Sequence, residues 1–231
     1  MTTAVVPQTN SVQRAAWLLR QPRSPAVFAA IVTSVAGYFD AVGYVQLGHL
    51  YVSFMSGNST HLGMSLAAGA WRDVVLAGFV VGAFVLGACL GTIVVDRSGA
   101  TRVVAVLLAE LLVLLTALGL AVSIDPRAAM IGVAAAMGMQ NAVHQLIAGA
   151  DVGRSFITGV LFNLGQSLAK VVAGKEGASR TMVVLALSWI AFVFGTVLGS
   201  LAFTTLGLQL SLAVGVAMVA MIIAFLAIGL L

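Results

Sequence analysis

The chain has 231 residues, of which 61% are hydrophobic and only 8% charged, and its formal net charge is +4. Soluble domains carry roughly a quarter charged residues, so this composition excludes a water-soluble protein and predicts a single all-α domain whose main partner is the lipid bilayer. The excess positive charge falls in the loops and near the N-terminus, where it indicates membrane topology rather than binding to nucleic acid.

Residues 1–24 are polar and are predicted to form a cytoplasmic leader. They contain Arg14, Arg20 and Arg23, and no short apolar core with a small-residue cleavage site follows them. This pattern does not predict a cleaved secretory signal. The membrane domain is expected to cover residues 25–231.

Eight apolar stretches follow within the membrane domain. Six of them are long enough for the roughly 20 residues of a spanning helix, and these lie at residues 25–46, 74–95, 103–123, 128–148, 182–206 and 208–230. The other two, at about 52–70 and 156–173, are shorter and are polar near their starts. We expect these two to be re-entrant or broken helical segments.

Three parts of the chain occur twice, in the same order and at a nearly constant offset. The matching pairs are 37–42 with 138–143, 54–67 with 156–169, and 83–91 with 191–199. The middle pair is identical at seven of fourteen positions and the last pair at six of nine. The matches predict two internal repeats, at about 25–123 and 128–230, which is a common construction of secondary transporters.

The path of the two short segments decides how the repeats are related. If each short segment enters and leaves on one side, nine of the 11 Lys and Arg residues face the cytoplasm, and only Arg72 and Arg127 face outside. If all eight stretches cross, the division is eight to three. Both arrangements place both termini in the cytoplasm of a multi-pass inner-membrane protein. The short length favours the first arrangement, which makes the repeats inverted, whereas eight crossings would make them parallel.

Each short segment carries a hydroxyl residue followed by glycine, Ser56-Gly57 in the first and Thr158-Gly159 in the second. A hydroxyl cap before a half-helix, with a glycine that permits an unusual backbone, would direct N–H groups and the positive end of the helix dipole into the protein. Broken-helix transporters bind anionic groups in this way. The alternative is that the glycines only allow helices to pack closely.

Glycines spaced by four residues occur on the equivalent long helix of each predicted repeat. This spacing is typical of close helix–helix contacts. The residues concerned are Gly78, Gly82, Gly87, Gly91, Gly195 and Gly199. We expect them to join the two repeats or two copies of the chain in a homo-oligomer.

Polar residues within the predicted spans indicate a possible pathway for a solute or an ion. Asp40 lies late in the first span, and Asn141 is its match in the second repeat. Asn58 and His61 follow in the nearby short segment, and His144 lies on the same helix face as Asn141. A carboxyl group inside a membrane is costly and often functional, since it can carry a proton or bind a cation. The alternative is that Asp40 only holds helices together by hydrogen bonds.

Glu110 has no counterpart in the second repeat. It lies two turns from Arg102 on one helix face, and this spacing predicts a structural ion pair. The sequence carries no metal-ligand spacing, no nucleophile elbow and no nucleotide-binding loop, so we expect neither an enzyme nor a cofactor.

Four motifs resemble the signature stretches of the YoaK-like family of uncharacterised bacterial inner-membrane proteins. The motifs are GYFDAVGY at 37–44, FMSGN at 54–58, GMQNA at 138–142 and FITG at 156–159. Ser56 stands where threonine is usual in that family, which keeps the hydroxyl group. The resemblance covers about residues 25–230 and implies a polytopic membrane protein without naming a substrate.

Two functions remain open at this point. The first is a secondary transporter or channel for an unidentified small solute, with its polar site between the repeats. The second is a non-transporting scaffold or sensor whose polar residues only hold helices together. A wet cavity bordered by the polar residues would favour the first, and a continuous dry core the second.

Overall fold

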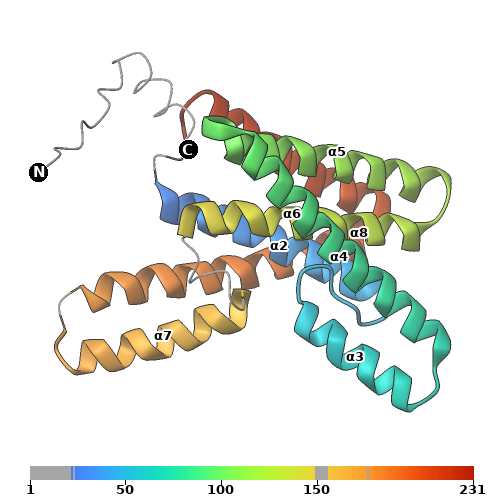
Figure 1. The fold of residues 1–231 in the computed structure, drawn as a ribbon, viewed down its shortest axis with the longest axis horizontal. Helices are drawn as coiled ribbons and strands as arrows, with labels where there is room; N and C mark the ends of the chain where they lie inside the picture. The colour runs from blue at the N-terminus through green and yellow to red at the C-terminus, as the bar shows by residue number, and fades with distance from the viewer. Residues whose placement is uncertain (1–21, 23, 149–155, 176) are drawn as a thin grey trace, which may run out of the picture.

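The computed structural model describes residues 22, 24–148, 156–175 and 177–231, so almost all of the predicted leader lies outside the described residues. The described part is all-α and contains seven α-helices and one short 3-10 helix. The elements are α2 (Pro25–Gln46), α3 (Met55–Ala67), α4 (Trp71–Arg97), η1 (Gly99–Thr101), α5 (Arg102–Ser123), α6 (Pro126–Ala148), α7 (Phe156–Val172) and α8 (Ala178–Ala227). Figure 1 shows the long helices lying roughly side by side.

Helix α8 is two helices joined at one residue. Gly207 has φ 76° and ψ 178° inside the 50-residue helix, a backbone conformation that glycine adopts without a steric penalty. The chain reverses there, and the second half of α8 returns beside the first (Figure 1). The break falls between the predicted stretches 182–206 and 208–230.

Four helices of the described residues, α2, α4, α5 and α8, are long and apolar enough to cross a membrane. Fifty helical residues span about 75 Å at 1.5 Å per residue, so α8 has enough length for two crossings of a hydrocarbon core about 30 Å thick. Helix α6 has 23 residues but is less apolar, because Gln140 and Asn141 lie within it.

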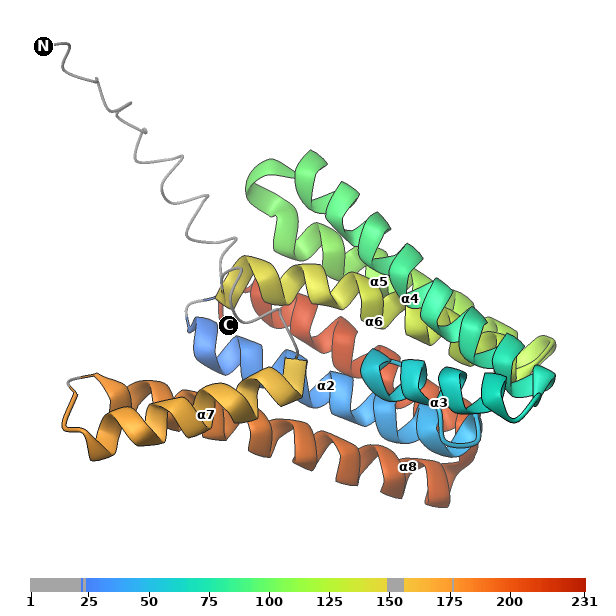
Figure 2. The same cartoon turned by 60° about the horizontal axis from the view of Figure 1, so that its bottom comes forward.

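In each half of the chain, the short helix ends at the same end of the molecule as the long helix before it. Figures 1 and 2 show α2 and α6 running in opposite directions. The short helix α3 runs in the same sense as α2 and ends at the same end of the molecule as α2 does. Helix α7 ends at the opposite end, the one where α6 finishes.

Glycines form the closest contacts between long helices. A Cβ built at Gly195 would meet the carbonyl oxygen of Ser34 on α2, and one at Gly87 would meet the carbonyl oxygen of Ala135 on α6. These contacts bring backbone against backbone, which only glycine allows. Helix α2 therefore packs tightly on the first half of α8, and α4 packs tightly on α6.

The next glycine along each helix makes the same kind of contact. A Cβ at Gly199 would meet the carbonyl oxygen of Tyr38, and one at Gly91 would lie 2.9 Å from the Cα of Met139. Both contacts continue the α2–α8 and α4–α6 packing by one helical turn. Four of the six glycines predicted to serve packing therefore lie at helix–helix contacts within the chain.

Gly78 and Gly82 lie in different surroundings. A Cβ built at either one would meet no atom within 4 Å. The physical reason is that this face of α4 is turned away from α6. Within the chain these two glycines therefore do not join the repeats, and their predicted packing role across two copies of the protein stays a prediction.

Candidate functional site

Asp40 is buried in the last third of α2, with 2% of its surface exposed. Its Oδ1 accepts hydrogen bonds from the backbone N–H groups of Val52, at 2.9 Å, and Ser53, at 2.6 Å. Its Oδ2 accepts from the hydroxyl of Ser53 at 2.6 Å. The carboxyl group therefore holds the non-helical segment 47–54 that leads back from the end of α2 to the start of α3.

Asn58 holds the same segment from the other side. This residue of α3 is fully buried, its Oδ1 accepts from the backbone N–H of Tyr51 at 2.9 Å, and its Nδ2 donates to the carbonyl oxygen of Tyr51 at 2.6 Å. A non-helical segment at membrane depth must have its backbone groups satisfied by protein. Asp40 and Asn58 together accept from the backbone N–H groups of residues 51–53, and Asn58 also donates to the carbonyl oxygen of Tyr51.

The start of α3 differs from the predicted hydroxyl cap. The residue that precedes the helix is Phe54, which makes no side-chain capping bond, and Ser56 is the second residue of the helix, with an exposed side chain. The carboxyl group of Asp40 instead accepts from the backbone N–H groups of Val52 and Ser53, just ahead of the helix.

Gly57 makes room for an aromatic ring. A Cβ at this position would lie 2.6 Å from the ring of Phe54 and 3.3 Å from that of Tyr51. The Tyr51 and Phe54 rings are in edge contact, with centroids 5.3 Å apart, and Tyr44 adds a third ring 5.0 Å from Tyr51. This aromatic group packs beside the hydrogen-bonded segment.

The other predicted pathway residues are less closely joined to Asp40. His61 is half-buried on α3, and Asn141 is half-buried on α6 with its Nδ2 donating to the carbonyl oxygen of Met137 on its own helix at 3.0 Å. Thr158 is exposed near the start of α7, beside the half-buried Gly159. The side chain of His144 lies outside the described residues.

Glu110 forms a buried pair that the sequence did not reveal. Its side chain is 0% exposed, and its Oε1 accepts from Nε2 of Gln140 on α6 at 2.9 Å. Its Oε2 has no hydrogen-bond partner. The predicted ion pair with Arg102 is wrong, because Glu110 faces α6 whereas Arg102 is exposed at the first residue of α5 and donates through Nε to the carbonyl oxygen of Gly99.

A family model described as "Protein of unknown function (DUF1275)" matches residues 28–226 of the chain. The chain belongs to the DUF1275 family. The match begins within α2 and ends near the end of α8, so it includes the Asp40 site and both short helices.

The DUF1275 chain is also similar to the UPF0700 transmembrane protein RA0705 of Rhizobium meliloti (strain 1021). The two are 29% identical over 192 residues, which is 82% of each chain. No solved structure matches the chain. The family match and the apolar helices together make this a multi-pass transmembrane protein of a family with unknown function.

Two hollows on the surface of this DUF1275 protein lie away from Asp40. One of about 620 Å³ lies between the starts of α4 and α6, and another of about 400 Å³ lies between α2 and α8. Neither is lined by Asp40, Asn58 or Asn141. Among the described residues, no group of three His, Cys, Asp or Glu side chains is placed to hold a metal ion.

Proposed function

We propose that this protein is a secondary transporter or channel for a small solute, located in the inner membrane with both termini in the cytoplasm. In this proposal α2, α4, α5, α6 and the two halves of α8 span the membrane, and α3 and α7 are re-entrant. The two repeats are inverted with respect to each other. We propose no catalytic role for the protein. The resemblance of its motifs to those of the YoaK-like family remains part of the proposal.

The observation that carries the proposal is a pair of helix–helix contacts, each of which joins the two halves of the chain through equivalent residues. Gly195 and Gly87 occupy the same position in the matched blocks 191–199 and 83–91. Their partners, Ser34 and Ala135, are also equivalent, since both lie three residues before the matched glycines at 37 and 138. The third helix of each half thus packs on the first helix of the other half, as a two-fold relation between repeats would require.

The two short helices support the inverted arrangement. At 1.5 Å per residue, the 13 residues of α3 and the 17 residues of α7 reach about 20 and 26 Å, which is less than the hydrocarbon thickness of about 30 Å. Each ends where the preceding long helix ends, at opposite ends of the molecule (Figures 1 and 2). Half-helices of opposite direction are typical of transporters with sites near the membrane centre.

The residues around the two half-helix starts are the proposed solute or ion pathway. The carboxyl group of Asp40 lies in one half, and the amide of Asn141 takes its place in the other. We infer that Asp40 supplies the charge for a coupling proton or cation. The remaining members of the pathway are Asn58, His61, His144, Ser56, Gly57, Thr158 and Gly159.

A second function is favoured by two observations. Neither of the two hollows is lined by Asp40, Asn58 or Asn141, whereas a wet cavity beside these residues was expected of a transporter. Both carboxyl oxygens of Asp40 accept from the protein's own segment 52–53, which is what a purely structural role would need. A non-transporting scaffold or sensor is therefore the competing proposal.

Uptake into liposomes tests the two proposals against each other. The purified protein would be reconstituted and assayed with and without a pH gradient, against a panel of cations, organic anions and neutral metabolites. A transporter should move at least one solute faster than protein-free vesicles do, and Asp40→Asn should abolish the effect of the gradient. Rates equal to those of empty vesicles across the panel would favour the scaffold.

A further inference from the structure

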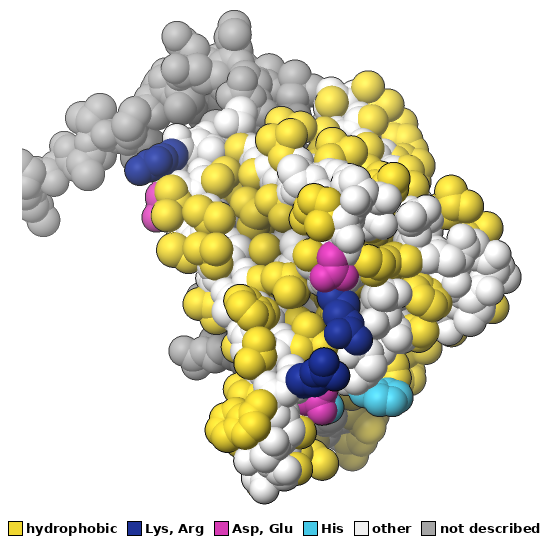
Figure 3. Space-filling model, turned by 90° about the vertical axis from the view of Figure 1, so that its right-hand side faces the viewer, with side chains coloured by type: hydrophobic (Ala, Val, Ile, Leu, Met, Phe, Trp, Pro, Cys, Tyr) yellow, Lys and Arg dark blue, Asp and Glu magenta, His cyan; other side chains and the backbone are white. Residues whose placement is uncertain are grey.

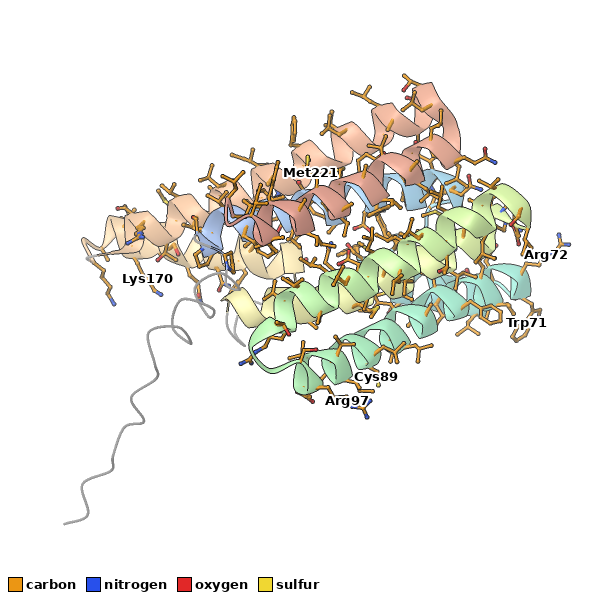
Figure 4. All side chains as sticks on the ribbon, turned by 90° about the horizontal axis from the view of Figure 1, so that it is seen from above. Trp71, Arg72, Cys89, Arg97, Lys170 and Met221 are labelled. Atoms are coloured by element: carbon orange, nitrogen blue, oxygen red, sulfur yellow. The ribbon has the colours of Figure 1, made fainter. Side chains whose placement is uncertain are left out.

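A hollow of about 620 Å³ opens at the end of the molecule where α4 and α6 begin. Arg72 and Arg127 line it, and each is the second residue of its helix. Both side chains are exposed. Figure 3 shows Lys or Arg side chains on this end with Asp or Glu side chains beside them and hydrophobic ones around them, and Figure 4 shows Arg72 projecting beyond the end of α4.

Asp125 is the only acidic residue among the described residues that line the hollow, and it is already engaged. Oδ1 of Asp125 accepts from the backbone N–H of Arg127 at 2.9 Å, so this carboxylate caps the start of α6. The two guanidinium groups have no such hydrogen bond to a carboxylate within the described residues. The polar end of the hollow therefore carries a net positive charge.

The rest of the hollow becomes apolar with depth. Val75 and Phe79 lie three and seven residues further along α4 and are 54% and 60% exposed. Seven helical residues correspond to about 10 Å along the axis. Ile131 continues the apolar lining on α6. Along the helix axis the surface thus changes from cationic to apolar within the length of a lipid headgroup and the first part of its acyl chain.

Trp71 marks the level of the membrane interface. It lines the charged end of the hollow, is 68% exposed, and projects from the first residue of α4 (Figure 4). Tryptophan is enriched where headgroups meet hydrocarbon. The charged end of the hollow therefore lies at headgroup depth, and Phe79 lies at the depth of the acyl chains.

We propose that this hollow binds one phospholipid with an anionic headgroup. The phosphate accepts hydrogen bonds from Arg72 and Arg127, since a guanidinium group matches phosphate geometry and stays charged. An acyl chain covers Val75, Phe79 and Ile131. A soluble anion would use the two arginines and leave the apolar part bare, and a choline headgroup would place a second cation beside them.

The test uses the delipidated full-length protein in a non-ionic detergent. Binding of phosphatidylglycerol, phosphatidylcholine and inorganic phosphate would be measured by native mass spectrometry and by the shift in melting temperature. We expect phosphatidylglycerol to bind and raise the melting temperature, and the other two to have little effect. Arg72→Gln and Arg127→Gln should each lower the affinity for phosphatidylglycerol roughly tenfold, as the loss of a charge-assisted hydrogen bond implies.

Two further variants separate a built site from general attraction. Arg97→Gln removes an equally exposed cation from the other end of α4 and should leave binding unchanged. Phe79→Gln should lower the affinity for the lipid, because it removes an apolar contact with the acyl chain while both arginines stay in place.

Three outcomes would overturn the proposal. The first is equal binding of the two lipids, and the second is an Arg97→Gln variant as weak as the Arg72→Gln variant. The third is inorganic phosphate that binds as well as phosphatidylglycerol, which would identify a site for a free anion instead.

Discussion

Replacing Gly87 or Gly195 by alanine should force apart two pairs of helices that now touch through their backbones. The new Cβ would lie 2.7 Å from the carbonyl carbon of Ala135 in the first case and 2.8 Å from that of Ser34 in the second. Ordinary contact begins at 3.4 Å and the carbonyl oxygens of Ala135 and Ser34 lie closer still, so the helices must separate by more than about 0.7 Å. The obstacle is backbone, which cannot rotate away as a side chain could.

The loss of stability in the Gly87 and Gly195 variants can be compared with that of two control variants on α4. Overfilling a packed site typically costs about 1–3 kcal/mol of unfolding free energy. Gly78→Ala and Gly82→Ala add the same methyl group where no atom lies within 4 Å, and alanine there should gain up to about 1 kcal/mol from its higher helix propensity. The two classes should therefore differ by roughly 1–4 kcal/mol.

Thermal unfolding in a mild detergent, followed for all four single variants, measures this difference. The Gly87 and Gly195 variants should melt below the wild type, and the Gly78 and Gly82 variants at or above it. The two interfaces are separate, so the double variant at 87 and 195 should show nearly the sum of the two losses. Equal melting of all four variants would refute the reasoning, and destabilisation by Gly78→Ala alone would place that glycine against a second copy of the chain.

Three other predictions follow from the buried polar groups and the proposed topology. Asp40→Asn keeps an oxygen for the backbone donors of the 52–53 segment, so the variant should fold normally and lose coupled uptake in liposomes; a variant that fails to insert would instead make the residue structural. Gln140→Leu leaves Oε1 of Glu110 buried without its donor and should cost about 1–3 kcal/mol in the same melting assay, while adding Glu110→Leu should recover most of the loss, and no recovery would contradict the pairing. In a cysteine-free background, a cysteine at Arg72 should react with an impermeant thiol reagent from outside and one at Arg97 only from inside, whereas the reverse pattern would require eight crossings.

The helices could be predicted closely from the sequence, because length and apolar composition dominate their positions. The first predicted span at 25–46 has the bounds of α2, and the short segments at 52–70 and 156–173 contain α3 and α7. The break between 206 and 208 was visible because Gly207 separates two stretches that are each long enough to cross a membrane. The glycine spacing found four positions that contact another helix within the chain, but it could not tell which face of α4 is turned to α6 and which, with Gly78 and Gly82, is turned away.

The partners of the polar residues could not be predicted in the same way. Asp40 and Asn58 were selected because polar groups in lipid are costly, and both are buried. Their partners are backbone groups of residues 51–53, which become accessible only because the chain turns back after α2. Glu110 and Gln140 are 30 residues apart, and nothing in local spacing places one opposite the other, whereas Arg102 offered a nearer but incorrect partner.

The reversal at Gly207 affects how the chain is inserted during synthesis. No charged residue follows Arg180, so the last 51 residues carry no lysine or arginine to hold any part of them on one side of the membrane. The two halves of α8 are joined by one glycine, without a polar loop between them. In the proposed topology the two halves would enter the bilayer as a single hairpin, oriented by Lys170, Lys175 and Arg180 upstream. A tag or protease site placed at Gly207 should therefore disturb insertion of both halves.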